Sequence, residues 1–265
     1  MPTILLDSPT PARSELPESS QDVQDLGRWL VFRYSPASLF SLKISRATST
    51  AGKTLLTPTP YAVKMAFLDA TLRNGLTDDP YSFVRSLASA VLRIGPPRHA
   101  CVTGTIQSVR HEARDAGHGR KPDSPAYRPS IAFREFVHYY GVLALAFDLK
   151  TCSADHVPLL LQAAPAVNYL GKRGGFVQYL SGARQPKLDS TFTQPVDGSN
   201  GPAGFGQRVI LDDFGPGASF ENLNSFASTE IRRGIDRKFV ETIVPLQVYN
   251  SGPGFVHYWA PAVTG

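Results

Sequence analysis

A glycine-rich run carries residue types that suit phosphate binding: Asn168-Tyr169-Leu170-Gly171-Lys172-Arg173-Gly174-Gly175-Phe176. Glycines let a backbone approach a phosphate closely, and Lys172 and Arg173 would neutralise the phosphate charge. Tyr169 and Phe176 offer aromatic faces on which bases could stack. The run is not a nucleotide P-loop, because GxxxxGK[ST] is absent, and it lacks the GxGxxG spacing of a dinucleotide fold. The pattern predicts a turn that binds a polyanion.

A second basic segment covers residues 98–130 and has a formal charge of +3. Glycines and prolines interrupt its middle, so it is too broken for a packed element and should project as a mobile hairpin or finger. Cations on such a projection can grip phosphates, and Tyr127 could stack on a base. The alternative is a solvated loop without a partner. Its cations are Arg98, Arg110, Arg114, Arg120, Lys121 and Arg128.

Hydrolytic chemistry has weaker support in the sequence. The GxSxG elbow and the HExxH helix are both absent. Metal-independent RNA cleavage would need only a base for the 2′-hydroxyl and a cation for the phosphorane, and His111, His118 and His138 lie in or near the basic finger. Paired acids at 78–79 and 212–213 could bind a cation, but adjacent acids in Gly- or Pro-rich stretches are more typical of turns. No metal site is therefore expected.

Composition places the chain among ordinary globular proteins. It has 265 residues, 42% of them hydrophobic, and a formal net charge of +5, a mild bias toward polyanions. Cys101 and Cys152 form no CxxC pair, which argues against structural zinc. The sequence shows neither a signal peptide nor an apolar run long enough for a membrane span. We expect a soluble cytoplasmic protein with reduced thiols and no cofactor.

The elements that must position these residues can be predicted from spacing. Residues 1–26 are expected to be flexible, and Trp29–Tyr34 to form a first strand that is buried on both faces. Residues 35–56 are predicted to be a long exposed loop that leaves Lys43, Arg46 and Lys53 in solvent. Thr57-Pro58-Thr59-Pro60 then fixes the start of an amphipathic helix, because Thr59 can cap it and Pro60 needs no backbone donor at the first helical position.

The rest of the chain alternates between regular elements and loops. A second helix should begin at Asp79-Pro80, followed by strands over 100–109 and 130–149 with a turn at Gly141. A short helix should start near Ser153 and stop at Pro165. Residues 181–219 are predicted to be mostly loop, including a tight turn at 204–206. Strand character returns over 239–249 and 255–259.

The order of these parts resembles the RAMP superfamily of CRISPR-associated proteins, and most closely the Cas-five family, the Cascade subunit that holds the 5′ handle of the guide RNA. The resemblance depends on the first strand ending near Tyr34, the turn and helix over Thr57–Leu68, the basic finger, Phe133-Arg134-Glu135-Phe136, and the glycine-rich run. It covers roughly residues 27–180, and its motifs are short and rich in common residues.

The resemblance implies an α+β fold with a ferredoxin-like, RNA-recognition-motif-like core over 27–180. The finger at about 98–130 would fold over guide RNA, and residues 181–265 would form a loop-rich region packed on the core. It further implies a place in a complex with backbone and large subunits, which meets target DNA through that complex. Most members bind without cutting, and this chain has no histidine in its first strand or first helix, where related processing enzymes often carry one.

We therefore expect a non-catalytic guide-RNA-binding subunit. Two alternatives stay open: a metal-independent endoribonuclease of the same superfamily, using Tyr61, His111 or His118, and an unrelated α+β small-molecule enzyme or interaction protein with a pocket near 204–213. The residues expected to contact RNA are Tyr61, Lys64, Arg110, Arg114, Arg120, Lys121, Arg128, Tyr169, Lys172 and Arg173.

Overall fold

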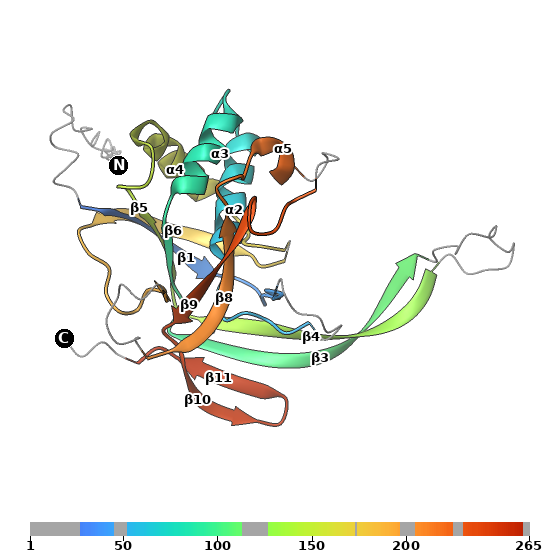
Figure 1. Ribbon diagram of the computed structural model, residues 1–265. Helices are drawn as coiled ribbons and strands as arrows, with labels where there is room; N and C mark the ends of the chain where they lie inside the picture. Colours follow the sequence, from blue (N-terminus) through green and yellow to red (C-terminus); the bar gives the residue numbers. More distant parts are fainter. Residues whose placement is uncertain are drawn as a thin grey trace, which may run out of the picture.

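The computed structural model shows an α+β protein in which antiparallel sheets predominate, as the sequence predicts (Figure 1). The structure describes residues 27–44, 52–112, 127–172, 174–196, 205–224 and 230–261. The segment 1–26, expected to be flexible, lies outside the described residues.

A four-stranded sheet forms the centre, with strand order β2-β5-β1-β6 and antiparallel pairing throughout. The chain runs strand, helices, strand, strand, helix, strand, and the first and third strands of this series lie in the middle. This is the ferredoxin-like arrangement, confirmed here by the pairing itself. The elements are β1 (Trp29–Pro36), α2 (Pro60–Arg73), α3 (Pro80–Ser89), β2 (Leu92–Gly95), β5 (Leu143–Asp148), the 3-10 turn Ala154–His156, α4 (Val157–Ala163), the 3-10 turn Ala164–Ala166, and β6 (Val177–Gln185).

Strand β1 is buried on both faces, as predicted. Phe32 points toward the helices, where its ring centroid lies 5.5 Å from that of Phe67 in α2 and 6.1 Å from that of Phe147 in β5. On the opposite face, Trp29 and Val31 pack in a smaller cluster with Phe192. The central sheet is thus a middle layer, and burying apolar surface on both of its faces is the main stabilisation it receives.

Helix α2 begins at Pro60, the position that the sequence predicts. The Thr59 hydroxyl accepts a hydrogen bond from the Ala62 backbone N–H at 3.1 Å, and Pro60 occupies the first turn. Helix α3 begins in the same way at Pro80, with Asp79 accepting from the Ser82 N–H at 3.0 Å. The acid at 79 is therefore a helix cap.

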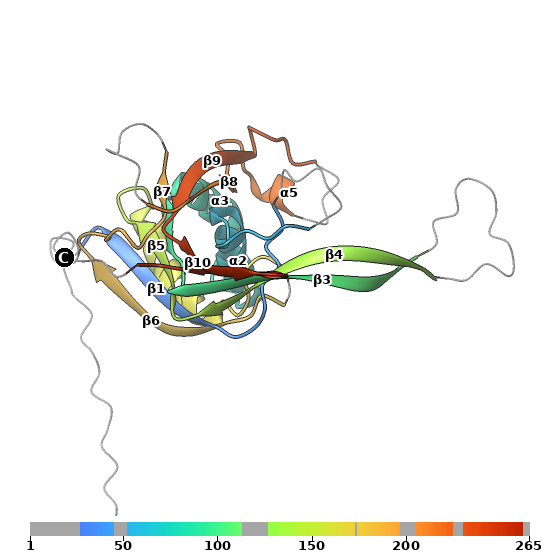
Figure 2. The same ribbon diagram turned by 90° about the horizontal axis from the view of Figure 1, so that it is seen from below.

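A long hairpin is inserted between β2 and β5. Strands β3 (His99–Glu112) and β4 (Tyr127–Tyr140) pair without interruption over their whole length and project from the body in both views (Figures 1 and 2). The hairpin forms where the basic finger was predicted. Its strands reach further toward the tip than expected: β3 continues to Glu112, beyond the predicted end at 109, and β4 begins at Tyr127, before the predicted start at 130. At its base it joins β11 (Phe255–Trp259) and β10 (Gln247–Gly252), giving the order β10-β11-β3-β4.

The third sheet corrects one prediction. Residues 181–219 were expected to be mostly loop, yet β6 continues to Gln185 and β8 crosses beside α2. Sequence 239–249, expected as one strand, belongs to two, because the backbone turns at 245–246. The sheet has the order β7-β9-β8, and its elements are β7 (Gln194–Pro195), β8 (Gln207–Phe214) and β9 (Arg237–Val244), with the short helix α5 (Phe220–Leu223) between the last two.

The stretch after β1 is another correction. It was expected to be an exposed loop, but Phe40, Leu42, Leu55 and Leu56 are buried. Backbone hydrogen bonds between Phe40 and Val137 fasten the stretch to the free edge of β4. Polar residues between these apolar ones hid the pattern. Lys43 and Lys53 are exposed, as expected, and Arg46 lies outside the described residues.

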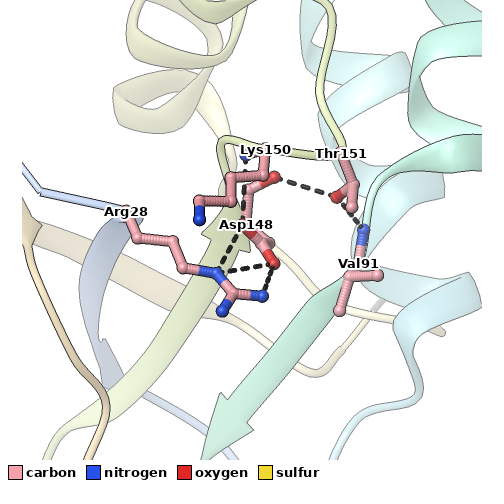
Figure 3. Close-up of polar contacts among 5 residues, drawn as sticks. All are labelled: Arg28, Val91, Asp148, Lys150 and Thr151. Carbon is pink, nitrogen blue, oxygen red and sulfur yellow. Dashed lines mark hydrogen bonds and ion pairs between the residues drawn. The ribbon is translucent and has the colours of Figure 1, made fainter. Parts of the chain in front are cut away.

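A polar cluster closes one end of the central sheet (Figure 3). Arg28 donates from Nε to both carboxylate oxygens of Asp148 at 3.0 Å, and the Lys150 backbone N–H donates to the same carboxylate at 3.1 Å. Thr151 accepts from the Val91 N–H at 2.8 Å. Burial raises the pKa of Asp148, but the hydrogen bonds from Arg28 and Lys150 outweigh this and hold the pKa below its usual value. The cluster is a fully paired structural junction.

Candidate nucleic-acid interface

A groove of about 580 Å³ lies beside the first turns of helix α2. We call it the α2 groove. Its walls come from distant parts of the sequence: the stretch after β1, the exposed side of α2, the glycine-rich run, and the ends of β8 and β9. It brings together three of the residues predicted to contact RNA, namely Tyr61, Tyr169 and Lys172, with Lys43, Asp69, Asp212 and Arg237.

The glycine-rich run forms the turn that positions Tyr169 and Lys172. The Leu170 N–H donates to the Gly175 carbonyl at 2.9 Å, and the chain reverses through Gly171 at φ +76°. A Cβ on Gly175 would lie 2.8 Å from the Phe40 ring, so only glycine fits there. The Tyr169 hydroxyl lies 3.4 Å from Asp69 of α2. The turn thus holds Tyr169 against one wall of the groove and leaves Lys172 exposed.

Lys172 belongs to a group of neighbouring cations. The pKa of Lys172 is lowered, first by partial burial and then by the charges of Arg134 in β4 and Lys43. Within the described residues, no carboxylate lies within ion-pair distance of Lys43 or Lys172. Like charges held together in this way favour an anion between them.

Tyr61 lies at the other end of the groove and is already stacked. The Arg237 guanidinium sits 4.1 Å from the centroid of its ring, and Phe214 makes an edge contact at 5.2 Å. Arg237 also forms an ion pair with Asp212. Burial raises the pKa of the Tyr61 phenol, against the lowering effect of Arg237. This phenol therefore stays protonated near neutral pH and is poorly suited to act as a base.

The structure corrects the prediction for Lys64, which was expected on the rim of the groove. Its side chain is fully buried between α2 and β8, and its ammonium lies 2.7 Å from Asp213. Burial lowers the pKa of Lys64, while Asp213 raises it. The acids at 212–213, interpreted as turn formers, are buried at the end of β8 and pair with Arg237 and Lys64. Lys64 cannot reach a ligand in this arrangement.

The hairpin strands carry two of the remaining predicted contacts, Arg110 and Arg128. Arg110 is exposed on β3 and is paired in register with Pro129, and the backbone of Arg128 belongs to β4. Exposed apolar side chains lie nearby, with Ile106 72% and Ile131 81% exposed. Arg114, Arg120, Lys121 and Arg173 lie outside the described residues, as does His118.

Cleavage chemistry is not assembled in the α2 groove. None of its described lining residues is a histidine, and its acids, Asp69 and Asp212, are paired with Arg73 and Arg237. In the described ranges, no cluster of three or more His, Cys, Asp or Glu side chains is arranged to hold a metal ion. What the groove offers is stacking surface and positive charge.

Sequence reasoning missed several residues of this site. Arg237 carries no local motif, Lys43 was expected only to be in solvent, and Arg134 was noted only within Phe133-Arg134-Glu135-Phe136. Lys43 and Arg237 line the groove, and Arg134 acts on Lys172 beside it, through pairing between distant segments such as the bridge between Gly52 and Arg134. Within the described part of the chain, no helix is both long and apolar enough to span a membrane.

No protein-family model and no curated protein matches the chain. Among solved structures, it is similar to the crystal structure of a CRISPR protein from Archaeoglobus fulgidus, with 11% identity and a TM-score of 0.44, over 88% of this chain and 92% of that chain. It is also similar to a chain of a CRISPR RNA-guided surveillance complex, with 13% identity and a TM-score of 0.44, over 81% and 88%. Similarity at this level assigns neither a family nor a function.

Proposed function

We propose that this protein is a non-catalytic guide-RNA-binding subunit of a CRISPR Cascade-type effector complex, and that the α2 groove grips the 5′ handle of the RNA. One observation carries the proposal: Tyr61 of helix α2 and Tyr169 and Lys172 of the glycine-rich run, singled out in two separate segments, line one groove with Lys43 and Arg237. Stacking faces interleaved with cations are what single-stranded RNA requires.

Each lining residue has a distinct part in this proposal. Lys43 and Lys172 bind consecutive phosphates, since they are exposed cations without a carboxylate partner among the described residues. Tyr169 stacks on a base. Arg237 extends the stack that begins at Tyr61, because a guanidinium plane lying on an aromatic ring can accept a base on its outer side.

The projecting hairpin supplies the second part of the grip and a contact to a neighbouring subunit. Arg110 adds phosphate binding along the RNA. The further predicted contacts are Arg114, Arg120, Lys121 and Arg128 of the same segment and Arg173 of the glycine-rich run. Ile106 and Ile131 expose apolar surface on a structure that extends from the body, which suits a backbone or large subunit. Target DNA is met through the assembled complex.

Salt-dependent binding to repeat-derived RNA tests the groove. Lys43→Ala with Lys172→Ala should lower the affinity and reduce the slope of log K against log salt by about 1.4, because two phosphate contacts to a single strand are lost. The matched control is Lys150→Ala with Lys187→Ala, which removes the same charge at the other end of the central sheet, where β5 and β6 meet the start of β1. Equal slopes in the two double variants would contradict the proposal.

Two further readouts separate the alternatives. RNA that stays intact after prolonged incubation with the protein in EDTA supports a binding role, whereas cleavage under those conditions supports the endoribonuclease. Co-purification with a short RNA of uniform length and several proteins supports the complex. Recovery as a lone RNA-free monomer would support an unrelated small-molecule enzyme or interaction protein.

A further inference from the structure

The sheet β10-β11-β3-β4 has one face without a covering layer among the described residues. Its inner face packs on the core through Ala100, Val137 and Tyr139. Because side chains alternate along a strand, the residues between these point the opposite way. The register places Trp259, His99 and Tyr140 in one row across β11, β3 and β4, and His257, Cys101 and His138 in the next.

Aromatic and imidazole rings gather on this outer face. Tyr249 of β10 lies 5.1 Å from His257 and 5.7 Å from Trp259 between ring centroids, in edge contacts. His99 approaches His257 with its Nδ1 3.1 Å from the partner's Nε2. We call the set the histidine–aromatic face, comprising His99, His138, Tyr140, Tyr249, His257 and Trp259.

Three of these six rings are open to solvent: Tyr140 is 74% exposed, Tyr249 is 64% exposed, and His138 is exposed as well. His99, His257 and Trp259 are half-buried beside them. A stable fold gains little from aromatic side chains left in water, since their free-energy contribution comes from burial. A concentration of exposed rings on one flat sheet therefore indicates a ligand that covers them.

Charge selects the class of that ligand. Glu135 of β4 falls on an inner-face register position and accepts a hydrogen bond from the Thr54 N–H. Arg98 is exposed directly beside His99, whose pKa is lowered by burial first, then by His257 and by Arg98. The charge that the described residues place beside this face is thus that of a cation, which suits a polyanion.

We infer that the histidine–aromatic face is a second binding surface for single-stranded nucleic acid, separate from the α2 groove, on which bases stack against Tyr140 and Tyr249 and Arg98 contacts a phosphate. Both RNA and DNA can make stacking and phosphate contacts, so a single strand of either nucleic acid fits this face. A flat array of rings suits an extended strand of unpaired bases better than a duplex, whose bases are already stacked on one another.

Binding is measured on the full chain carrying Lys43→Ala and Lys172→Ala, with fluorescein-labelled oligo(U) and oligo(dT) of equal length. This background removes the proposed groove contacts, so failure of the groove proposal does not affect the result. Tyr140→Ala with Tyr249→Ala should weaken binding of both oligomers by roughly tenfold or more, since each base stacked on an aromatic ring contributes substantially. Tyr140→Phe with Tyr249→Phe should restore it, and Phe205→Ala, which removes an exposed ring elsewhere, should leave it unchanged.

Trp259 gives a local readout that does not depend on affinity. Oligomer binding should quench its fluorescence, and Trp259→Phe should abolish the quenching while the chain still binds. Unchanged affinity in the Tyr140→Ala, Tyr249→Ala variant, together with no change in Trp259 emission, would overturn the inference. Protection of the face only by a purified partner subunit would likewise overturn it, in favour of a protein interface. If the Tyr140→Ala, Tyr249→Ala variant lost affinity only for oligo(U) or only for oligo(dT), the result would support the inference and would identify the nucleic acid that the face prefers.

Discussion

The junction at Asp148 and the α2 groove both concentrate positive charge, but they differ in what neutralises it. At the junction, Arg28 meets a buried carboxylate that also accepts a backbone hydrogen bond (Figure 3). In the groove, Lys43 and Lys172 lie near Arg134, and the described residues provide no carboxylate for either lysine. The first arrangement stabilises the folded chain, and the second raises its free energy until an anion arrives.

The same contrast separates two lysines that the sequence treats alike. Lys64 and Lys172 were both expected to contact phosphate. Lys64 is buried against Asp213 and fastens the third sheet to α2, whereas Lys172 stays exposed among other cations. Whether a cation has a carboxylate partner therefore indicates whether its role is structural or is open to ligand binding. Measuring stability and RNA affinity on the same variants tests this distinction.

The largest expected effect is on stability at Lys64. Lys64→Ala leaves the buried Asp213 carboxylate with the Phe214 backbone N–H and with the more distant cation Lys238, 3.6 Å away, and should lower the free energy of unfolding by about 3 kcal/mol. Urea denaturation measures this. Lys64→Met combined with Asp213→Asn removes both charges and should recover most of the loss. The RNA affinity of the folded Lys64→Ala protein should match that of the parent. A loss of RNA affinity without a loss of stability would show that Lys64 contacts RNA after all.

The next effect is at Asp148 and depends on pH. Asp148→Asn removes the charge that Arg28 and Lys150 contact and should cost about 2 kcal/mol at pH 7. Because the folded-state pKa of Asp148 lies below its usual value, the stabilisation is present above about pH 3.9 and is lost as pH falls through the folded-state value. The difference in unfolding free energy between wild type and variant should therefore shrink as pH falls below about 3.9. A difference that stays constant as pH falls through this range would contradict the pairing.

The sequence predicted what local chemistry controls. Thr59 and Pro60 fix the start of α2 by themselves, and the glycine-rich run forms a turn, as its residue types predict. That this turn lines the groove with Tyr169 and Lys172 was not predicted. The prediction for Lys64 was wrong because β8 covers it, and β8 lies far away in the chain.

Long-range pairing explains the other omissions. Arg237 reaches Tyr61 only because β9 pairs with β8 beside α2, and no local spacing encodes that contact. The stretch after β1 looked like a loop because its buried residues, such as Phe40 and Leu55, are separated by polar ones, and because Phe40 and Gly52 join the edge of β4 through isolated bridges. The residues alone predicted a mixed α+β class and the family resemblance implied the core topology, whereas the groove depends on which edges and sheets meet.

A smaller effect is expected at the groove, where stability should be kept or rise while RNA affinity falls. Lys43→Ala with Lys172→Ala should leave the free energy of unfolding unchanged or raise it by up to about 0.5 kcal/mol, because a repulsion is removed at the surface. The same variant should bind repeat-derived RNA at least tenfold more weakly, as judged by fluorescence anisotropy. A loss of stability comparable to that of Asp148→Asn would show that these lysines are structural and would remove the contrast with the junction.

The smallest effect is a pH dependence of RNA binding. The pKa of Lys172 lies below its usual value because of burial, Arg134 and Lys43, and only the charged ammonium attracts phosphate. Affinity should therefore fall as pH rises from 7 toward 10 at constant salt. Lys172→Arg should flatten this dependence, since a guanidinium keeps its proton across the range. Burial raises the pKa of Tyr61, so that phenol stays neutral over most of the titration and does not mimic the effect. An equal decline of affinity in the Lys172→Arg protein would show that another group titrates, and it would contradict the role proposed for Lys172 in the groove.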